Sequence, residues 1–150
     1  MKKITIVISL LAYSVLSFAQ SSVGSGRKQL FDYNWKFSLG DDSLARLRDF
    51  NDNAWRNLDL PHDWSIEDLP NQSDSVIGPF TSKSIGTTAT GYTVGGTGWY
   101  RKHFILNNTP GKKVTIYFDG VYMNSDVWIN GHHLGNHPYG YTPFHYDLSP

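Results

Sequence analysis

The chain has 150 residues and a mass of 17.0 kDa, contains 13 Lys and Arg against 13 Asp and Glu, and has no cysteine. A formal charge of zero argues against nucleic acids and anionic membranes as partners, because both require clustered positive charge. The lack of cysteine excludes disulfides, thiolate metal sites and a cysteine nucleophile. Aromatic residues at 15%, charged residues at only 17%, 14 Gly and 7 Pro together favour one β-rich globular domain.

The N-terminus has the three-part plan of a secretory signal peptide. The first three residues form a basic head, residues 4–16 are almost wholly apolar, and small residues then lead to Ala19. The apolar run is too short to span a bilayer well. We therefore predict a signal peptide over residues 1–19 that is cleaved after Ala19, a flexible leader over residues 20–29, and a secreted or periplasmic protein.

Residues 30–60 predict two extended pieces around a polar stretch. Aromatic residues alternate along residues 30–37, which is the period of a half-buried strand. Residues 41–53 are polar, with two leucines at helical spacing, and predict a short helix or a turn. Residues 55–60 predict a second extended piece, which Pro61 ends.

The middle of the chain predicts loops. Residues 63–80 contain prolines and read as an irregular loop. Residues 81–98 are rich in Gly, Ser and Thr and have little to bury. A long surface loop of this kind is usually functional or mobile.

The C-terminal half carries clearer strand signals. Apolar and polar residues alternate along residues 114–118, and Asn130-Gly131 is the strongest short signal for a type I′ hairpin turn. Further strands are predicted over residues 99–106, 125–129, 132–134 and 144–148. Short strands at regular spacing with strong turns indicate a sandwich or jelly roll.

The sequence specifies no catalytic or metal centre. Glu67 is the single glutamate beside twelve aspartates, whereas glycoside hydrolysis normally needs two carboxyls at a set separation; the aspartates leave that chemistry open. No Gly-x-Ser-x-Gly elbow is present. His132 and His133 are neighbours in a predicted strand and point to opposite faces, so we expect no metal site there.

Loop residues with aromatic and polar side chains point instead to sugar binding. Aromatic faces stack on the C–H side of sugar rings, while Asn and Asp bind the hydroxyls. Two groups meet this description, and the alternative for each is packing inside the protein. The candidate substrate-binding residues are His62, Asp63 and Trp64 in one loop, and Tyr122, Asn124 and Asp126 behind the Asp-Gly-Val tripeptide of residues 119–121.

Four blocks in order resemble the family 2 glycoside hydrolases, above all the β-galactosidases of Bacteroidetes. The first block is Trp-Arg-x-Leu-x-Leu-Pro-His-Asp-Trp over residues 55–64, and the second is Gly-Trp-Tyr-Arg-Lys-x-Phe over residues 98–104. The third is Phe-Asp-Gly-Val-Tyr-Met-Asn-Ser-Asp-Val-Trp-Ile-Asn-Gly over residues 118–131. Gly-Tyr-Thr-Pro-Phe-x-x-Asp-Leu over residues 140–148 completes the set.

This resemblance implies that residues 30–150 form a galactose-binding-like jelly-roll sandwich, the family's sugar-binding domain. In the family an immunoglobulin-like domain and a TIM barrel follow, and the barrel carries two catalytic glutamates. We therefore expect no catalytic residue in this chain and no activity from residues 1–150 alone. The family's jelly roll continues beyond the Asp147-Leu148 block, so we expect this domain to be incomplete and the chain to be a fragment or a truncated product.

The resemblance also implies function. The parent protein would hydrolyse terminal β-D-galactosides, with a galactoside or another β-glycoside and the family's other two domains as the partners of this chain. No cofactor is expected within the chain, although magnesium or sodium often serves the family's barrel. An asparagine close behind the Asp-Gly-Val tripeptide contacts sugar in the family; Asn124 is the candidate, and an ungapped match places Tyr122 there.

Three alternatives stay open. The chain could be a free-standing carbohydrate-binding module, in which Trp64 and the Asn124 loop would supply weak affinity. It could be a purely structural interaction domain. Its parent could also be a β-glucuronidase or a β-mannosidase, because the barrel residues that select the sugar are not in this sequence.

Overall fold

The computed structural model describes residues 28–106 and 111–149. The predicted signal peptide and most of the predicted leader lie outside these residues. The chain divides into two units, residues 1–31 and residues 32–150, and the few described residues of the first unit lie outside any helix or strand. No helix in the described part of the chain is long and apolar enough to cross a membrane.

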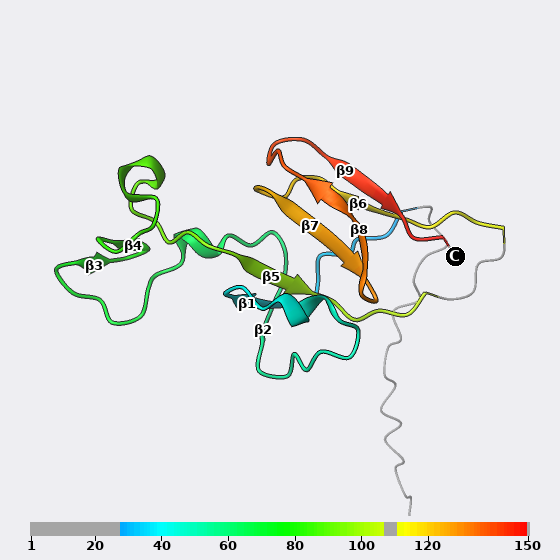
Figure 1. The fold of residues 1–150 in the computed structure, drawn as a ribbon, viewed down its shortest axis with the longest axis horizontal. Helices are drawn as coiled ribbons and strands as arrows, with labels where there is room; N and C mark the ends of the chain where they lie inside the picture. The colour runs from blue at the N-terminus through cyan, green and yellow to red at the C-terminus, as the bar shows by residue number, and fades with distance from the viewer. Residues whose placement is uncertain (1–27, 107–110, 150) are drawn as a thin grey trace, which may run out of the picture. The chain divides into compact units, whose positions relative to one another are not determined.

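The described residues form an all-β structure, as expected, with three 3-10 turns and no α-helix. Four small antiparallel sheets have the strand orders β2-β1-β5, β3-β4, β6-β9 and β7-β8 (Figure 1). The elements are β1 (Trp35–Leu39), η1 (Ser43–Arg46), β2 (Arg56–Leu58), η2 (Trp64–Ile66), β3 (Val76–Ile77), β4 (Phe80–Thr81), η3 (Thr87–Thr90), β5 (Gly98–Arg101), β6 (Thr115–Phe118), β7 (Ser125–Ile129), β8 (His132–His137) and β9 (Phe144–Asp147).

The first strand begins five residues later than its aromatic alternation predicts. Asn34 adopts φ 59°, a left-handed conformation that breaks an extended chain, and its backbone N–H donates to Asp59 Oδ1 at 2.8 Å. Residues 30–34 are therefore not part of β1. Tyr33, predicted to share the buried face, is exposed, whereas Phe37 at the centre of the sheet is 6% exposed.

Two aspartates cap two of the three 3-10 turns. The Asp42 side chain accepts from the Leu44 backbone N–H and caps η1, which is the short helix or turn expected in residues 41–53. Asp63 caps η2 in the same way through the Ser65 N–H. The predicted irregular loop of residues 63–80 thus contains a capped turn, and β3 and β4 form a short hairpin at its end.

The C-terminal strands follow the sequence pattern closely. Along β6 exposed and half-buried residues alternate, and β7 covers the predicted residues. Asn130 and Gly131 have φ values of 49° and 85°, the positive values that a type I′ turn requires. β8 extends to His137, three residues past the predicted end, because it stays paired with β7 up to Ser125.

Aromatic contacts connect these sheets. Trp99 of β5 and Trp128 of β7 lie 5.4 Å apart between ring centroids. His137 of β8 stacks on Phe144 of β9 at 4.2 Å. Among the described residues only Phe37 and Ala45 are buried apolar side chains, so side-by-side rings rather than a deep core hold β5 to β7 and β8 to β9.

Candidate functional site

Two loops of equal length meet at one end of the C-terminal strands. Phe118 of β6 pairs with Phe144 of β9, and Ser125 of β7 pairs with His137 of β8. The two loops are residues 119–124 and residues 138–143. Each loop runs from one of these pairs to the other, so strand pairing holds both of its ends. The Asn124 backbone N–H donates to the Pro138 carbonyl at 3.3 Å and joins them directly.

A tyrosine from the first loop packs on the second loop. A methyl group built on Gly140 would lie 2.4 Å from Cδ2 of Tyr122, so only glycine allows this approach. The Tyr122 and Tyr141 rings meet edge to face at 5.6 Å, and Tyr139 contacts Tyr141 in the same way at 5.6 Å. We call Tyr122, Tyr139, Tyr141 and Asn124 the tyrosine platform.

The platform is open to solvent. Its rings are exposed by 70% at Tyr122, 58% at Tyr139 and 75% at Tyr141. Asn124 is exposed and adopts φ 55°, a conformation that asparagine tolerates better than most residues. Its side-chain amide makes no hydrogen bond to any other described residue. Open aromatic faces beside an unbound amide are the groups that a sugar ring needs.

The third predicted residue of this loop region has a protein partner. Asp126 Oδ1 lies 2.8 Å from His133 Nε2, across the β7-β8 pair, and both side chains are partly exposed. An exposed pair of this kind contributes little to stability. Within the described ranges, no group of three or more His, Asp or Glu side chains is placed to hold a metal ion.

His62 lies in a hydrogen-bonded network instead of on an open surface. Its side chain is 10% exposed, and its Nδ1 lies 2.7 Å from the Tyr100 hydroxyl. Its Nε2 faces Glu67 Oε1 at 3.0 Å and Arg56 Nη2 at 2.8 Å. Arg56 also donates to both Glu67 oxygens, at 2.8 and 2.9 Å. Both ring nitrogens of His62 are therefore occupied by protein groups.

This network shifts two pKa values. Hydrogen bonds from Arg56 lower the pKa of Glu67, against the opposing effect of burial, and His62 adds a further hydrogen bond. Burial raises the pKa of Tyr100 to about 12, and the nearby charges of Asp63 and Glu67 act in the same direction. Glu67 is thus held as a carboxylate and Tyr100 as a neutral phenol, which suits a fixed hydrogen-bonding role.

Trp64 lies beside this network. A methyl group built on Gly98 would lie 2.7 Å from its Nε1, so the indole packs directly on the β5 backbone. Trp64 also lines an open hollow of about 390 Å³, together with Phe37, Arg56 and Glu67. No hydrogen bond, ion pair or ring contact among the described residues connects this region to the tyrosine platform.

A buried ion-pair cluster was not found by sequence reasoning. Asp52 is 5% exposed, and Lys36 Nζ lies 2.7 Å from its Oδ1. Arg101 Nε and His103 Nε2 lie 2.9 and 2.6 Å from its Oδ2. Burial opposes ionisation of this carboxyl, but the contacts with Lys36 and His103 outweigh it and lower its pKa to about 2.

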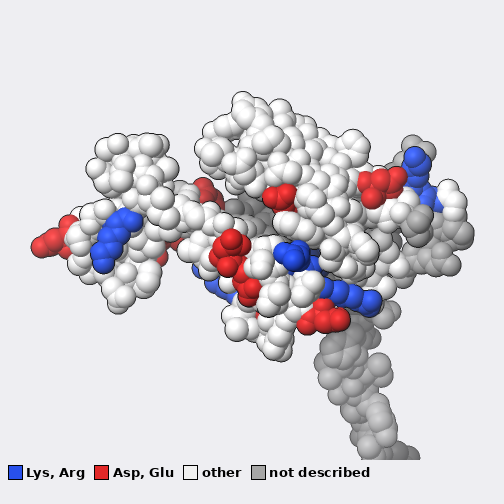
Figure 2. All heavy atoms as spheres, in the orientation of Figure 1, with Lys and Arg blue, Asp and Glu red and all other residues white. Residues whose placement is uncertain are grey.

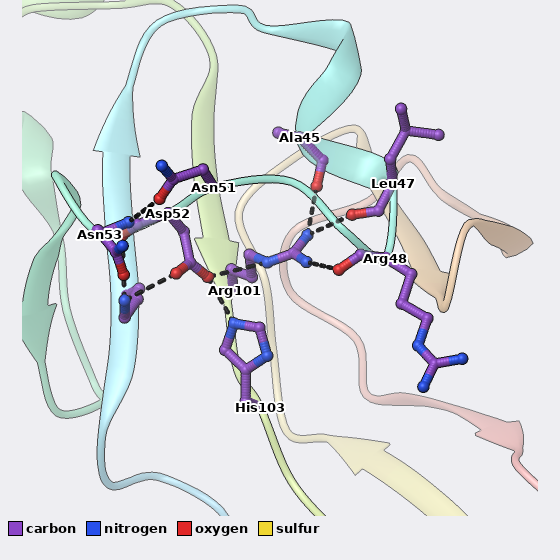
Figure 3. Close-up of polar contacts among 9 residues, drawn as sticks. Ala45, Leu47, Arg48, Asn51, Asp52, Asn53, Arg101 and His103 are labelled. Atoms are coloured by element: carbon purple, nitrogen blue, oxygen red, sulfur yellow. Dashed lines mark hydrogen bonds and ion pairs between the residues drawn. The ribbon is translucent and has the colours of Figure 1, made fainter.

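Arg101 also binds the backbone of η1 and of the segment that follows it. Arg101 donates to the backbone carbonyls of Ala45 at 2.7 Å, Leu47 at 3.0 Å and Arg48 at 2.7 Å (Figure 3). Ala45 lies in η1, and Leu47 and Arg48 follow directly after it; the Leu47 carbonyl also accepts from the Phe50 backbone N–H at 3.3 Å. The cluster therefore ties β1, β5 and the segment between η1 and β2 together, and its role is structural.

Comparison with known proteins identifies relatives of this chain. Residues 28–150 match the family described as glycosyl hydrolases family 2, sugar binding domain. The chain is 47% identical over 134 residues to the β-galactosidase BoGH2A of Bacteroides ovatus, and 36% identical over 121 residues to a β-glucuronidase of Formosa agariphila. A crystal structure of a family 2 glycosyl hydrolase from Bacteroides cellulosilyticus superimposes with a TM-score of 0.72 at 47% identity.

The matches cover most of this chain and a small part of each relative. They span 88% of this chain and 15% of the Bacteroides ovatus protein, and 80% of this chain and 11% of the Formosa agariphila protein. The structural match covers 80% of this chain and 15% of the crystallised protein.

Proposed function

Because this chain belongs to the glycosyl hydrolases of family 2, through their sugar binding domain, we propose that it helps hold the substrate of a β-galactosidase-like enzyme. The catalytic carboxyls would lie in another domain of the same protein. The observation that carries this proposal is the 47% identity to a β-galactosidase over 134 residues. The single glutamate, Glu67, bonded to Arg56 and His62, supports a chain without its own catalytic pair.

We propose that the four small sheets are parts of one jelly-roll sandwich. The aromatic contacts between β5 and β7 and between β8 and β9 support this arrangement for the sheets β2-β1-β5, β7-β8 and β6-β9, since a sandwich packs side chains of neighbouring sheets against one another. A glycoside and the remaining domains of the same protein would be its partners. The protein would be secreted or periplasmic, and any magnesium or sodium would serve the catalytic domain.

We assign sugar contact to the tyrosine platform. Its rings and the Asn124 amide are exposed and free of competing hydrogen bonds among the described residues. Asp126, paired with His133, would contribute less. His62 would act as an internal brace, with Asp63 capping η2 and Trp64 packing on β5 beside it.

Kinetics of the complete protein that contains this chain would test the proposal. We expect hydrolysis of nitrophenyl β-D-galactoside, and a fall in kcat/KM of about tenfold in Asn124→Gly, because one hydrogen bond to the sugar in the transition state is worth about 1.4 kcal/mol. Glycine keeps the positive φ and removes only the amide. Tyr33→Ala, at an exposed ring outside the platform, is the control.

A β-glucuronidase parent is the second candidate, favoured by the 36% identity to such an enzyme. Selective hydrolysis of nitrophenyl β-D-glucuronide would establish it and reject the galactosidase proposal. Saturable galactoside binding without hydrolysis of either substrate would instead favour a free-standing binding module.

A further inference from the structure

Residues 130–131 form the only Asn-Gly pair in the sequence. The backbone nitrogen that follows an asparagine can attack the side-chain amide carbon of that asparagine. Glycine hinders this attack least, because it has no Cβ. When Gly131 N bonds to Asn130 Cγ, the Cγ–Nδ2 bond breaks and the leaving group takes the proton of the Gly131 N–H. Ammonia departs, and a five-membered succinimide ring remains in the chain.

Water then opens this ring in one of two ways. Addition to Cγ restores the ordinary backbone and leaves an aspartate in place of Asn130. Addition to the backbone carbonyl carbon leaves the chain running through Cγ, which is an isoaspartate with one extra methylene group in the backbone. Water is the only co-reactant, and either product carries one negative charge more than Asn130.

The folded turn keeps the two reacting groups apart. Asn130 and Gly131 have φ values of 49° and 85°. They connect Ile129 to its partner His132 as a type I′ turn. At the first central position of this turn ψ is about 30°, which rotates the Gly131 nitrogen toward the Asn130 nitrogen and away from the Asn130 Cβ. Ring closure requires the Gly131 nitrogen on the Cβ side, so the folded hairpin blocks the reaction.

Within the described residues, no side-chain contact restrains the reacting groups. Asn130 and Gly131 are both exposed, and neither the Asn130 side chain nor the Gly131 N–H makes a hydrogen bond to another described residue. The turn borders an open hollow of about 510 Å³ on the side of Leu44 and Leu47, so neighbouring side chains do not pack tightly around it. The protection of Asn130 therefore comes from the backbone conformation.

The end of the hairpin that carries the turn has few contacts that keep it closed. A bulge between Val127 and Trp128 interrupts the β7-β8 pairing and leaves only two paired positions between itself and the turn. β7 and β8 contain no Lys or Arg, and Figure 2 shows the surface over β8 and β9 without them. The ion pair of Asp126 with His133 across the strands is exposed and contributes little. Local opening of this end therefore needs less free energy than unfolding of the domain.

We propose that Asn130 is a modification site that the type I′ turn protects and that local opening of the β7-β8 hairpin exposes to spontaneous deamidation. The aspartate product can close the hairpin again, because Asp-Gly also favours this turn. The isoaspartate product cannot, because its extra methylene group lengthens a two-residue connection whose length sets the pairing of Ile129 with His132. It thereby also releases Trp128, whose ring lies 5.4 Å from that of Trp99 and connects β7 to β5. This modification does not depend on the proposed role in sugar binding.

Incubation of the complete protein in mildly alkaline buffer, followed by peptide mapping with mass spectrometry, would measure the rate of conversion. We expect conversion at Asn130 to be at least about tenfold faster in urea-unfolded protein than in folded protein, because unfolding removes the protecting ψ. In the unfolded protein Asn130 should convert faster than every other asparagine, with Asn124, which precedes a serine, as the internal reference. Equal rates in folded and unfolded protein, or no conversion at Asn130 in unfolded protein, would overturn the inference.

Two glycine variants test whether opening of the hairpin end controls the reaction. His132→Gly loosens the exposed first position of β8, and Thr115→Gly makes the same kind of change at the exposed first position of β6. Folded His132→Gly should convert severalfold faster than wild type, whereas Thr115→Gly should convert at the wild-type rate. Both variants should match wild type in urea, where no hairpin protects Asn130. Equal acceleration in the two folded variants would overturn the inference, because global unfolding would then control the reaction.

Hydrogen exchange of the separated products tests the effect on the hairpin. Ion exchange separates the converted protein by its added negative charge, and endoproteinase Asp-N, which cleaves before aspartate and not before isoaspartate, distinguishes the two products. Backbone amides of β7 and β8 should lose protection in the isoaspartate form and keep it in Asn130→Asp. Full protection in the isoaspartate form would overturn the inference that this product prevents closure of the hairpin.

Discussion

Replacement of Asp52 by Asn should destabilise the protein by about 2 to 4 kcal/mol. The lower figure follows from the pKa, which is lowered from 3.8 to about 2 and thus corresponds to about 2 kcal/mol. The upper figure approaches the cost of removing one partner from a buried ion pair. The change leaves Lys36 and Arg101 facing a neutral amide inside the cluster.

Urea unfolding of the complete protein, followed by tryptophan fluorescence, would measure this loss. For the transition in which this domain unfolds, with a slope of about 2 kcal/mol per molar urea, the midpoint should fall by about 1 to 2 M. Asp126→Asn is the matched control, because it breaks an exposed pair of the same chemistry with His133 and should cost less than about 1 kcal/mol. Similar midpoint shifts in the two variants would refute the reasoning.

The pH dependence provides a second check on the same residue. Because the folded-state pKa of Asp52 is lowered, its contribution is fully present above the unfolded value near 4. The contribution disappears as the pH falls through about 2. The stability gap between wild type and Asp52→Asn should therefore narrow between pH 4 and pH 2. A gap that stays constant over this range would show that the charge of Asp52 is not its source.

Three further predictions concern separate contacts. Gly98→Ala should lower the melting temperature by several degrees, because its methyl group meets Trp64 at 2.7 Å, whereas Gly95→Ala, with nothing within 4 Å, should not. Glu67→Gln should lower the free energy of unfolding by less than about 1 kcal/mol, since the Glu67 carboxylate is 41% exposed. Because the pKa of Glu67 is lowered, the wild-type protein should lose this contribution as the pH falls below 4.5, whereas Glu67→Gln should not, as measured by urea titrations at pH 3 to 5. Asn124→Ala should be about 1 kcal/mol less stable than Asn124→Gly in chemical unfolding, because φ is 55° there, and equal stabilities would contradict a left-handed backbone.

Elements set by local chemistry were predictable from the sequence. The Asn130-Gly131 turn needs two positive φ values and has them, which fixes the register of β7 and β8 as far as Trp128 and His133; a bulge then shifts the register before Val127. The alternation around Ile116 placed β6 correctly. Each of these signals involves residues within a few positions of one another, so no knowledge of the tertiary structure is needed.

Features that depend on distant partners were not predictable. Asn34 ends the aromatic alternation because its N–H finds Asp59, 25 residues away. The cluster around Asp52 collects Lys36 and Arg101 from separate strands, and no spacing links them. The burial of Asp52 and its charged partners can be recognised only once the pairing of the strands is known.

The candidate site shows the same division. Sequence reasoning placed Tyr122 and Asn124 in a loop between two strands, and the structure adds Tyr139 and Tyr141 from the facing loop. These residues come together because the β6-β9 and β7-β8 pairs fix both ends of both loops. His62 was a candidate for sugar contact because it lies in a loop, yet its ring nitrogens both face protein groups.

The contact between Trp99 and Trp128 gives the molecule an internal optical reporter. Two indole rings 5.4 Å apart and inclined by 33° couple their electronic transitions. Their joint circular dichroism should show a pair of bands of opposite sign that neither ring produces alone. Because Trp99 belongs to β5 and Trp128 to β7, this signal exists only while those two sheets touch, and it would vanish on separation of the sheets even if every strand kept its hydrogen-bonded neighbour.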